Sequence, residues 1–167
     1  MAGVTFKGNA LTLVGDLVKV GDTAPGFAAL GNDLSSVSLA DLAGKPLVLT
    51  SVPSLDTPVC DLQARRFNQE ATSFGGGVSV VVVSCDLPFA QARWCGATGS
   101  AAIRTLSDHR DVSFGTAYGL LIKELRLLAR SVVVIDSTGT VRYVQLVGEV
   151  THEPDYEAAL AAVEALV

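Results

Sequence analysis

Short apolar runs and longer mixed stretches alternate along the chain. Residues 47–52 (LVLTSV) and 78–84 (VSVVVVS) are almost continuous apolar runs, and the second is rich in valine. Such runs predict strands that are buried on both faces, as in a sheet covered by helices. Between them, residues 58 to about 72 predict a helix, which the glycine run at 75–77 ends. This order of strand, helix and strand predicts an α/β fold.

The remaining segments extend the same pattern to both ends of the chain. The pattern predicts an N-terminal hairpin of residues 5–7 and 11–13 around GNA, a turn-rich extended segment at 21–27 (GDTAPGF), a short helix after Pro88, a helix at about 111–118, a hairpin within 131–147 that turns at 137–139, and a helix from about 154 to 166. The sequence contains no internal repeat, linker or low-complexity tract. We therefore expect residues 1–167 to form a single domain.

Composition and charge narrow the class of protein. Apolar residues make up 49% of the chain and charged residues 17%, which excludes a disordered protein. The net charge is −5 and no basic cluster exceeds the pair Arg65–Arg66, so we expect no nucleic-acid or membrane partner. The apolar runs are too short to span a bilayer, and the first residues lack a signal-peptide pattern. Three cysteines, an odd number, argue against a secreted disulfide scaffold and favour a cytoplasmic location.

The stretch PSLDTPVC, residues 53–60, places a cysteine where the predicted helix begins. Thr57 is a good N-cap and Pro58 suits the first helical position, so Cys60 is expected in the first turn. Backbone N–H groups there have no intrahelical acceptor and the helix dipole is positive, which favours a nucleophilic thiolate. The Thr57 hydroxyl can reach the sulfur or the group that the sulfur attacks. The residues alone leave open whether Cys60 is a nucleophile or an inert buried cysteine.

Other candidate groups have simpler interpretations. Three cysteines without a C-x-x-C pair make a poor zinc site, and no motif indicates a metal or an organic cofactor. His109 and His152 are isolated in polar segments, so both are expected on the surface. Trp94 and Phe89 are expected in the core or in an interface.

Four separated segments resemble one family, in order along the chain. Pro53, Thr57 and Cys60 form the P-x-x-x-T-x-x-C pattern of the peroxiredoxin active site. Three further segments are similar to peroxiredoxins: GDTAPGF (21–27), DLPFAQARWCG (86–96), which looks like the thiol peroxidase subgroup, and LLARSVVVID (127–136). The resemblance implies a thioredoxin-like fold, with a central mixed β-sheet, flanking helices and an N-terminal β-hairpin.

The resemblance also implies roles for individual residues. Cys60 would be the peroxidatic nucleophile, which attacks a hydroperoxide and becomes a sulfenic acid. Thr57, the Cys60 backbone N–H and Arg130 would donate hydrogen bonds, and Pro53 would wall the pocket. Cys95 would resolve the sulfenic acid through an intrachain Cys60–Cys95 disulfide. If both cysteines lie on helices, local unwinding is needed before they can bond.

The implied activity is the reduction of hydrogen peroxide and organic hydroperoxides to water or alcohols. The resemblance implies thioredoxin as the reductant and a homodimer as the assembly. Cys85 departs from the subgroup, which commonly carries a small residue at that place. We interpret Cys85 as a buried structural thiol, with an auxiliary redox role as the alternative.

Two other functions remain open on the sequence. A thioredoxin-like disulfide oxidoreductase would use a C-x-x-C motif, but Cys60 is followed by DLQ. A non-catalytic redox sensor or binding module of thioredoxin-like fold could use the same cysteines. Catalytic oxidation of thioredoxin by peroxide would separate the peroxidase from both.

Overall fold

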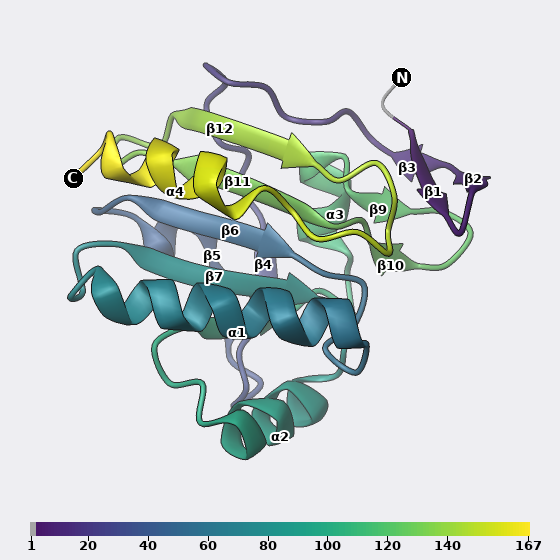
Figure 1. Ribbon diagram of the computed structural model, residues 1–167, viewed down its shortest axis with the longest axis horizontal. Coiled ribbons are helices and arrows are strands. Elements are labelled where there is room, and N and C mark those ends of the chain that lie inside the picture. Colours follow the sequence, from purple (N-terminus) through teal and green to yellow (C-terminus); the bar gives the residue numbers. More distant parts are fainter. Residues whose placement is uncertain (1–2) are drawn as a thin grey trace.

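A seven-stranded mixed β-sheet forms the centre of the computed structural model, which describes residues 3–167 (Figure 1). Across the sheet, the strands follow the order β12 (Val141–Leu146), β11 (Ser131–Ile135), β6 (Leu47–Ser51), β7 (Ser79–Ser84), β8 (Arg104–Ser107), β4 (Ala28–Leu30) and β5 (Ser36–Ser38). Strands β6, β7 and β8 run parallel to one another, and the other neighbouring pairs are antiparallel. The expected central mixed sheet is therefore confirmed.

Alternate residues of the central strands pack into two separate cores, one on each face of the sheet. Leu49 and Val81 belong to one core, whereas Val48 and Val82 belong to the other. All five residues of β6 are buried. Because neither face meets water, these strands need no polar alternation, which explains their continuous apolar sequences.

Within residues 3–167, four α-helices cover the sheet (Figure 1). They are α1 (Pro58–Ser73), α2 (Pro88–Thr98), α3 (Ser113–Tyr118) and α4 (Tyr156–Glu164), and a short 3₁₀ helix, η1 (Leu39–Leu42), precedes β6. Residues of α1, α2 and α4 share one core, and those of α3 belong to the core on the opposite face. The four helices that the sequence predicts are confirmed, and the ends that it predicts for α1, α3 and α4 differ from the observed ones by two residues at most.

Two small sheets lie beside the central one, near the N-terminus (Figure 1). One pairs β1 (Val4–Phe6) with β2 (Asn9–Leu11), and the other contains β10 (Leu127–Leu128), β9 (Leu121–Ile122) and β3 (Leu13–Val14). The expected hairpin is present, but its turn is Lys7–Gly8 rather than GNA, because both of these residues adopt the positive φ that a tight hairpin turn requires. The expected second strand is also wrong in its bounds, since Thr12 separates β2 from β3.

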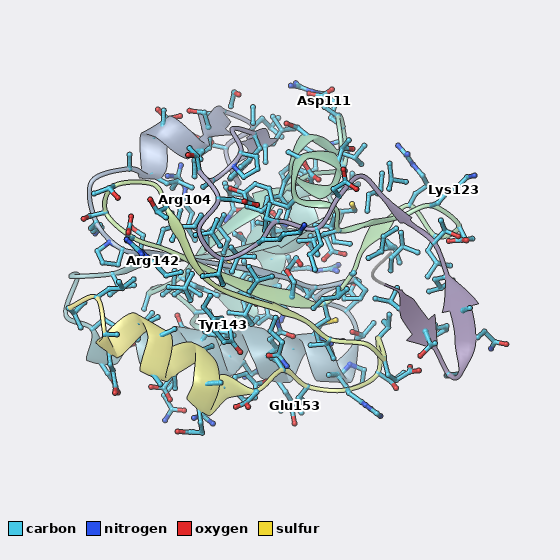
Figure 2. All side chains as sticks on the ribbon, turned by 90° about the horizontal axis from the view of Figure 1, so that it is seen from above. Arg104, Asp111, Lys123, Arg142, Tyr143 and Glu153 are labelled. Carbon is cyan, nitrogen blue, oxygen red and sulfur yellow. The ribbon has the colours of Figure 1, made fainter. Side chains whose placement is uncertain are left out.

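Polar side chains mark the periphery of the molecule. Asp111, Lys123 and Glu153 point outward at its rim when the molecule is viewed from above (Figure 2). Both histidines are exposed, as the sequence predicts. Trp94 is buried, as expected of a core residue, whereas Phe89 is 67% exposed and is not part of the core. No helix within residues 3–167 is long and apolar enough to cross a membrane.

Glu149, in the loop after β12, fastens the N-terminal hairpin to the rest of the chain. Its carboxylate accepts hydrogen bonds from the Thr5 hydroxyl at 2.6 Å and from the Lys7 N–H at 2.9 Å. Backbone bonds reinforce this link, because the Thr5 N–H donates to the Gly148 carbonyl and the Val150 N–H donates to the Thr5 carbonyl. The Thr5 hydroxyl, followed by the Lys7 N–H, lowers the pKa of Glu149 to about 2.

Acid should weaken this attachment. Because the folded pKa lies below the ordinary value of 4.5, ionised Glu149 stabilises the folded protein above about pH 4.5, and this contribution is lost as the pH falls towards about 2. Glu149→Gln should therefore lower the free energy of unfolding at neutral pH. Near pH 2 the free energy of unfolding of the variant should approach the wild-type value. Urea titrations across that range measure the difference. Glu164→Gln, at an exposed position, serves as the control; a Glu149→Gln difference that stays constant with pH would contradict the expectation.

Candidate active site

Cys60 lies in the first turn of α1, where the sequence predicts it. Thr57 occupies the N-cap position with extended backbone, and Pro58 is the first helical residue. This start is favourable because proline has no N–H to leave unpaired and its fixed φ suits the helix. The Cys60 side chain is fully buried. Helix geometry leaves its backbone N–H without an intrahelical acceptor.

Thr57 is the N-cap residue, as predicted, but its hydroxyl does not accept the hydrogen bond that such a cap usually makes. A cap would accept a hydrogen bond from the N–H of Val59 or Cys60. The hydroxyl instead turns back and donates to the Ser54 carbonyl oxygen at 3.0 Å. The first-turn N–H groups are therefore not occupied by this side chain, and they remain available to a ligand.

Arg130 lies between β10 and β11 and reaches the Cys60 sulfur from the sheet. Its Nη2 donates to Cys60 Sγ at 3.4 Å and to the Val150 carbonyl at 2.7 Å, and its Nε also donates to Val150 at 3.2 Å. Its Nη1 donates to Gln63 Oε1 at 2.7 Å. The guanidinium is thus fixed in place by acceptors from two different elements.

The charge of Arg130 has an unusual environment. The side chain is 2% exposed, and none of the ion pairs within residues 3–167 includes it. A guanidinium cannot lose its proton, and a buried charge is costly unless it is paired and hydrogen bonded. Val150 and Gln63 supply only neutral oxygens. A thiolate at Cys60 is the anion that would balance this charge.

Gln63 is a site residue that the sequence interpretation missed. It lies one turn after Cys60 on the buried face of α1 and is fully buried. Its Oε1 accepts from Arg130, while its Nε2 donates to the Thr50 hydroxyl at 2.6 Å. Thr50 in turn donates to the Ser131 carbonyl at 2.9 Å. The available signal was a polar residue on the same helical face as the candidate cysteine.

A mostly apolar cavity of about 340 Å³ adjoins Arg130. The lining residues come from the hairpin, the loop before α1, the first turn of α1 and the segments around β10 and β12: Phe6, Pro53, Ser54, Thr57, Pro58, Val59, Leu125, Leu127, Arg130, Val150 and Thr151. Three predicted site residues, Pro53, Thr57 and Arg130, therefore line one cavity. Cys60 lies against Arg130.

The structure does not bring Cys95 to this cavity. Cys95 lies near the C-terminal end of α2, and its sulfur contacts the Thr105 hydroxyl of β8 at 3.6 Å. A different cavity, which Asn32 and Arg104 also line, contains Cys95. Cys60 and Cys95 are both free thiols on intact helices. This is the arrangement for which local unwinding is expected from the sequence before a disulfide can form.

Cys85 has the character of an unreactive thiol. Burial, followed by the negative charges of Asp108 and Asp86, raises the pKa of Cys85 to about 12. Because the thiolate is the nucleophilic form, this sulfur is almost entirely protonated at neutral pH. Cys85 is only partly buried, so the expected complete burial is not observed, but the raised pKa supports a structural interpretation of this thiol.

Within residues 3–167, no cluster of three or more histidine, cysteine, aspartate or glutamate side chains could hold a metal ion. The polar groups around Cys60 are hydroxyl, amide, carbonyl and guanidinium groups. This donor set suits hydrogen bonding to an oxygen-containing substrate.

Comparison with known proteins identifies the class of this fold and site. The redoxin family model matches residues 19–160, and the chain belongs to this family. A peroxiredoxin-like protein from Aquifex aeolicus has a similar structure, with a TM-score of 0.93 and 41% sequence identity, over 100% of this chain and 98% of that one. A thiol peroxidase from Chromobacterium violaceum shares the fold with a TM-score of 0.87 at 21% identity, over 98% of this chain and 95% of that one.

Individual bacterial proteins match this chain at higher sequence identity and indicate a more specific class. The chain is 58% identical to a thiol peroxidase of Bacillus subtilis, over 100% of this chain and 99% of that protein. It is 52% identical to a thiol peroxidase of Staphylococcus aureus, over 97% of this chain and 98% of that protein. The expected class, a thiol-dependent peroxidase of peroxiredoxin type with a thioredoxin-like fold, is confirmed.

Gln63→Leu should slow the reaction of Cys60 with peroxide about tenfold, since a hydrogen bond to a charged group contributes roughly 1.5–3 kcal/mol. The substitution removes the acceptor that fixes Arg130 and replaces the amide with an apolar side chain of similar size. Stopped-flow measurement of the second-order rate constant tests this. Gln69→Leu, at an exposed position on the same helix, is the matched control. Equal rate constants for Gln63→Leu and wild type would show that Gln63 does not support the site.

Proposed function

We propose that the chain reduces hydroperoxides with Cys60 as the nucleophile and Cys95 as the resolving thiol. The observation that carries this proposal is the contact between Cys60 Sγ and the buried Arg130 guanidinium, which has no carboxylate partner within the described residues. A fixed positive charge beside a cysteine favours the thiolate, which is the reactive form. The same charge stabilises an oxygen that becomes negative during the reaction.

In the first step, the Cys60 thiolate attacks the terminal oxygen of a hydroperoxide. The new bond is S–O, the O–O bond breaks, and the two electrons of that bond leave with the second oxygen as an alkoxide or hydroxide. The terminal oxygen keeps its hydrogen, so the product on sulfur is a sulfenic acid. The departing oxygen takes a proton from water and leaves as an alcohol or as water. Arg130 and the free first-turn N–H groups supply donors to the reacting oxygens.

Thr57 orients the hydroperoxide. Its hydroxyl donates to Ser54, so its lone pairs remain available to accept the O–H hydrogen of the substrate. Accepting that hydrogen would direct the terminal oxygen towards the sulfur. Pro53 contributes an apolar wall without an N–H that would compete for the substrate.

The cavity lining supports organic hydroperoxides as substrates besides hydrogen peroxide. Phe6, Leu125 and Leu127 present apolar side chains at the cavity, together with Val59 and Val150. An alkyl chain removed from water by these side chains would gain affinity in proportion to its buried area. Hydrogen peroxide, with no alkyl chain, gains none of this affinity.

Cys95 completes the turnover. Its sulfur attacks the sulfur of the Cys60 sulfenic acid, an S–S bond forms, the S–O bond breaks, and water leaves with the Cys95 proton. A dithiol, which we propose is thioredoxin, then reduces the intrachain disulfide and becomes a disulfide itself. We further propose that the protein acts as a cytoplasmic homodimer.

A redox sensor with the same cysteines is the second candidate. A sensor would react with one equivalent of peroxide and stop, whereas the proposed enzyme turns over when thioredoxin, thioredoxin reductase and NADPH are supplied. Continuous NADPH oxidation at catalytic protein concentration therefore distinguishes the two.

Thr57→Val should lower the rate constant for peroxide reduction by roughly 10²-fold, because it preserves the shape of the side chain but removes a polar contact to the transition state. Thr57→Ser keeps a hydroxyl and should retain most of the activity. Steady-state kinetics with hydrogen peroxide and an alkyl hydroperoxide measure both. Wild-type rates in Thr57→Val would remove Thr57 from the site.

The two main cysteines should give different phenotypes when each is replaced. Cys60→Ser should consume no peroxide above background. Cys95→Ser should react once and stop at the Cys60 sulfenic acid, which a dimedone-type reagent traps or excess peroxide converts to a sulfinic acid. Intact-mass analysis and peptide mapping of oxidised wild type should find a Cys60–Cys95 disulfide within one chain.

Cys85→Ser is the matched control for these variants, and it should behave as wild type in each assay. A mapped Cys60–Cys85 bond, or a disulfide between two chains, would contradict the assignment of the resolving step.

A further inference from the structure

A hydrogen bond joins the two helices that carry the candidate redox cysteines. The Trp94 indole Nε1 donates to Asp61 Oδ1 at 2.8 Å. Asp61 directly follows Cys60 on α1, and Trp94 directly precedes Cys95 on α2. The two helices lie on the same face of the sheet, with α2 beside α1 at the lower edge of the view in Figure 1.

Asp61 is anchored on both sides. The Arg65 guanidinium, one turn later on α1, donates to its two carboxylate oxygens at 2.9 and 3.0 Å. Trp94 is buried in the core that α1 and α2 share, so its indole N–H needs an acceptor. Breaking the Trp94–Asp61 bond therefore costs free energy unless water can replace the carboxylate.

A second link holds the segments that precede the two helices. Asp86, two residues before α2, accepts from the Ser54 hydroxyl at 2.7 Å and from the Leu55 N–H at 2.8 Å, both in the loop before α1. The starts of the two helices are thus tied together independently of Trp94. Unwinding of the first turn of α1 would leave this tie intact, but it would carry Asp61 away from Trp94.

The two sulfurs point to different partners. Cys60 is directed into the interior against Arg130, and Cys95 against Thr105. A disulfide requires the Cα atoms of its cysteines within about 7 Å and their side chains directed at each other. Cys60 must therefore leave its helical position before Cys95 can reach it, and the residue that moves with it is Asp61.

We propose that the Trp94–Asp61 hydrogen bond is a latch that sets the rate at which Cys60 becomes accessible to Cys95. Asp61 and Trp94 are positioning residues, since the hydrogen bonds of the Cys60 and Cys95 sulfurs go to Arg130 and Thr105 and to neither of these two side chains. The latch slows the opening of the first turn of α1, and it must break before the disulfide can form. This inference rests on the proposed roles of Cys60 and Cys95.

The chemical consequence is a competition for the sulfenic acid. While the latch is closed, a second hydroperoxide can transfer an oxygen to the Cys60 sulfenic acid, which gives a sulfinic acid and an alcohol or water. When the latch opens, Cys95 forms the disulfide and releases water. A weaker latch should therefore speed disulfide formation and reduce the yield of sulfinic acid per turnover.

Trp94→Phe removes the indole N–H and keeps an aromatic ring. We expect disulfide formation to become roughly three to ten times faster, as for the loss of one partly exposed hydrogen bond to a charged acceptor. The rate constant for sulfenic acid formation should stay within about twofold of wild type. Acid-quenched, alkylated samples analysed by intact mass give both rates, and sulfinic acid per turnover should fall by a similar factor.

Matched variants separate the latch from general destabilisation. Asp61→Ala removes the acceptor and leaves Trp94 in place, so it should also speed disulfide formation, and the double variant should be no faster than either single variant. Arg65→Gln removes the ion pair but keeps the bond between Asp61 and Trp94. Its rate of disulfide formation should therefore be closer to the wild-type rate than that of Asp61→Ala. Asp61→Asn keeps an acceptor oxygen for Trp94, so its rate of disulfide formation should lie between those of Asp61→Ala and wild type.

Trp94 is also the single tryptophan of the chain, so its fluorescence reports the latch in the wild-type protein. After peroxide is added, the emission change should follow disulfide formation and not the earlier sulfenic acid. Unchanged or slower disulfide formation in both Trp94→Phe and Asp61→Ala would overturn the latch. If the wild-type protein forms no Cys60–Cys95 disulfide at all, the proposed function fails as well, and the two failures are thereby distinguished.

Discussion

A buried guanidinium that meets no carboxylate within the described residues governs the architecture of this site. A buried guanidinium is costly unless it is hydrogen bonded and paired, so the elements around Arg130 must supply oxygens and an anion. The loop after β12 supplies the Val150 carbonyl, α1 supplies Gln63, and Cys60 supplies the sulfur. Because Glu149 fastens that loop to the hairpin, even the first strands of the chain contribute to holding Arg130 in place.

The same contacts create opposing requirements. In the proposed mechanism, reaction with peroxide requires an intact first turn of α1, because the sulfur, the free N–H groups and Arg130 converge on one oxygen. The proposed Cys60–Cys95 disulfide requires that this turn come apart, because Cys95 lies on another helix against β8. A helix start satisfies both requirements. It has fewer backbone hydrogen bonds to lose than a helix centre, so it opens at lower cost than the rest of α1.

The sequence predicts features whose causes are local. Two-sided burial of β6 and β7 follows from their apolar runs, and the start of α1 follows from Pro58. The position of Gln63 on the helical face of Cys60 was visible in the sequence, but its burial was not, since a glutamine in a helix normally faces water and this one is buried by its contacts with Arg130 and Thr50. The direction of the Thr57 hydroxyl depends on the Ser54 carbonyl, which side-chain preferences alone do not specify. The short strands β8 to β10 and the Asp61–Trp94 contact arise from tertiary packing between distant segments. Arg130 and Cys95 became candidates only through the family resemblance.

The lining of the cavity also determines how the reaction can respond to pH. Among the residues that line it there is no histidine, lysine, tyrosine, aspartate or glutamate, and its one charged side chain is that of Arg130. A bell-shaped profile needs both an essential acid and an essential base. In the proposed mechanism, the thiolate of Cys60 is the group that attacks the peroxide. The peroxide step should therefore have a one-sided pH profile, in which the rate rises as the sulfur ionises and then stays level until the protein unfolds.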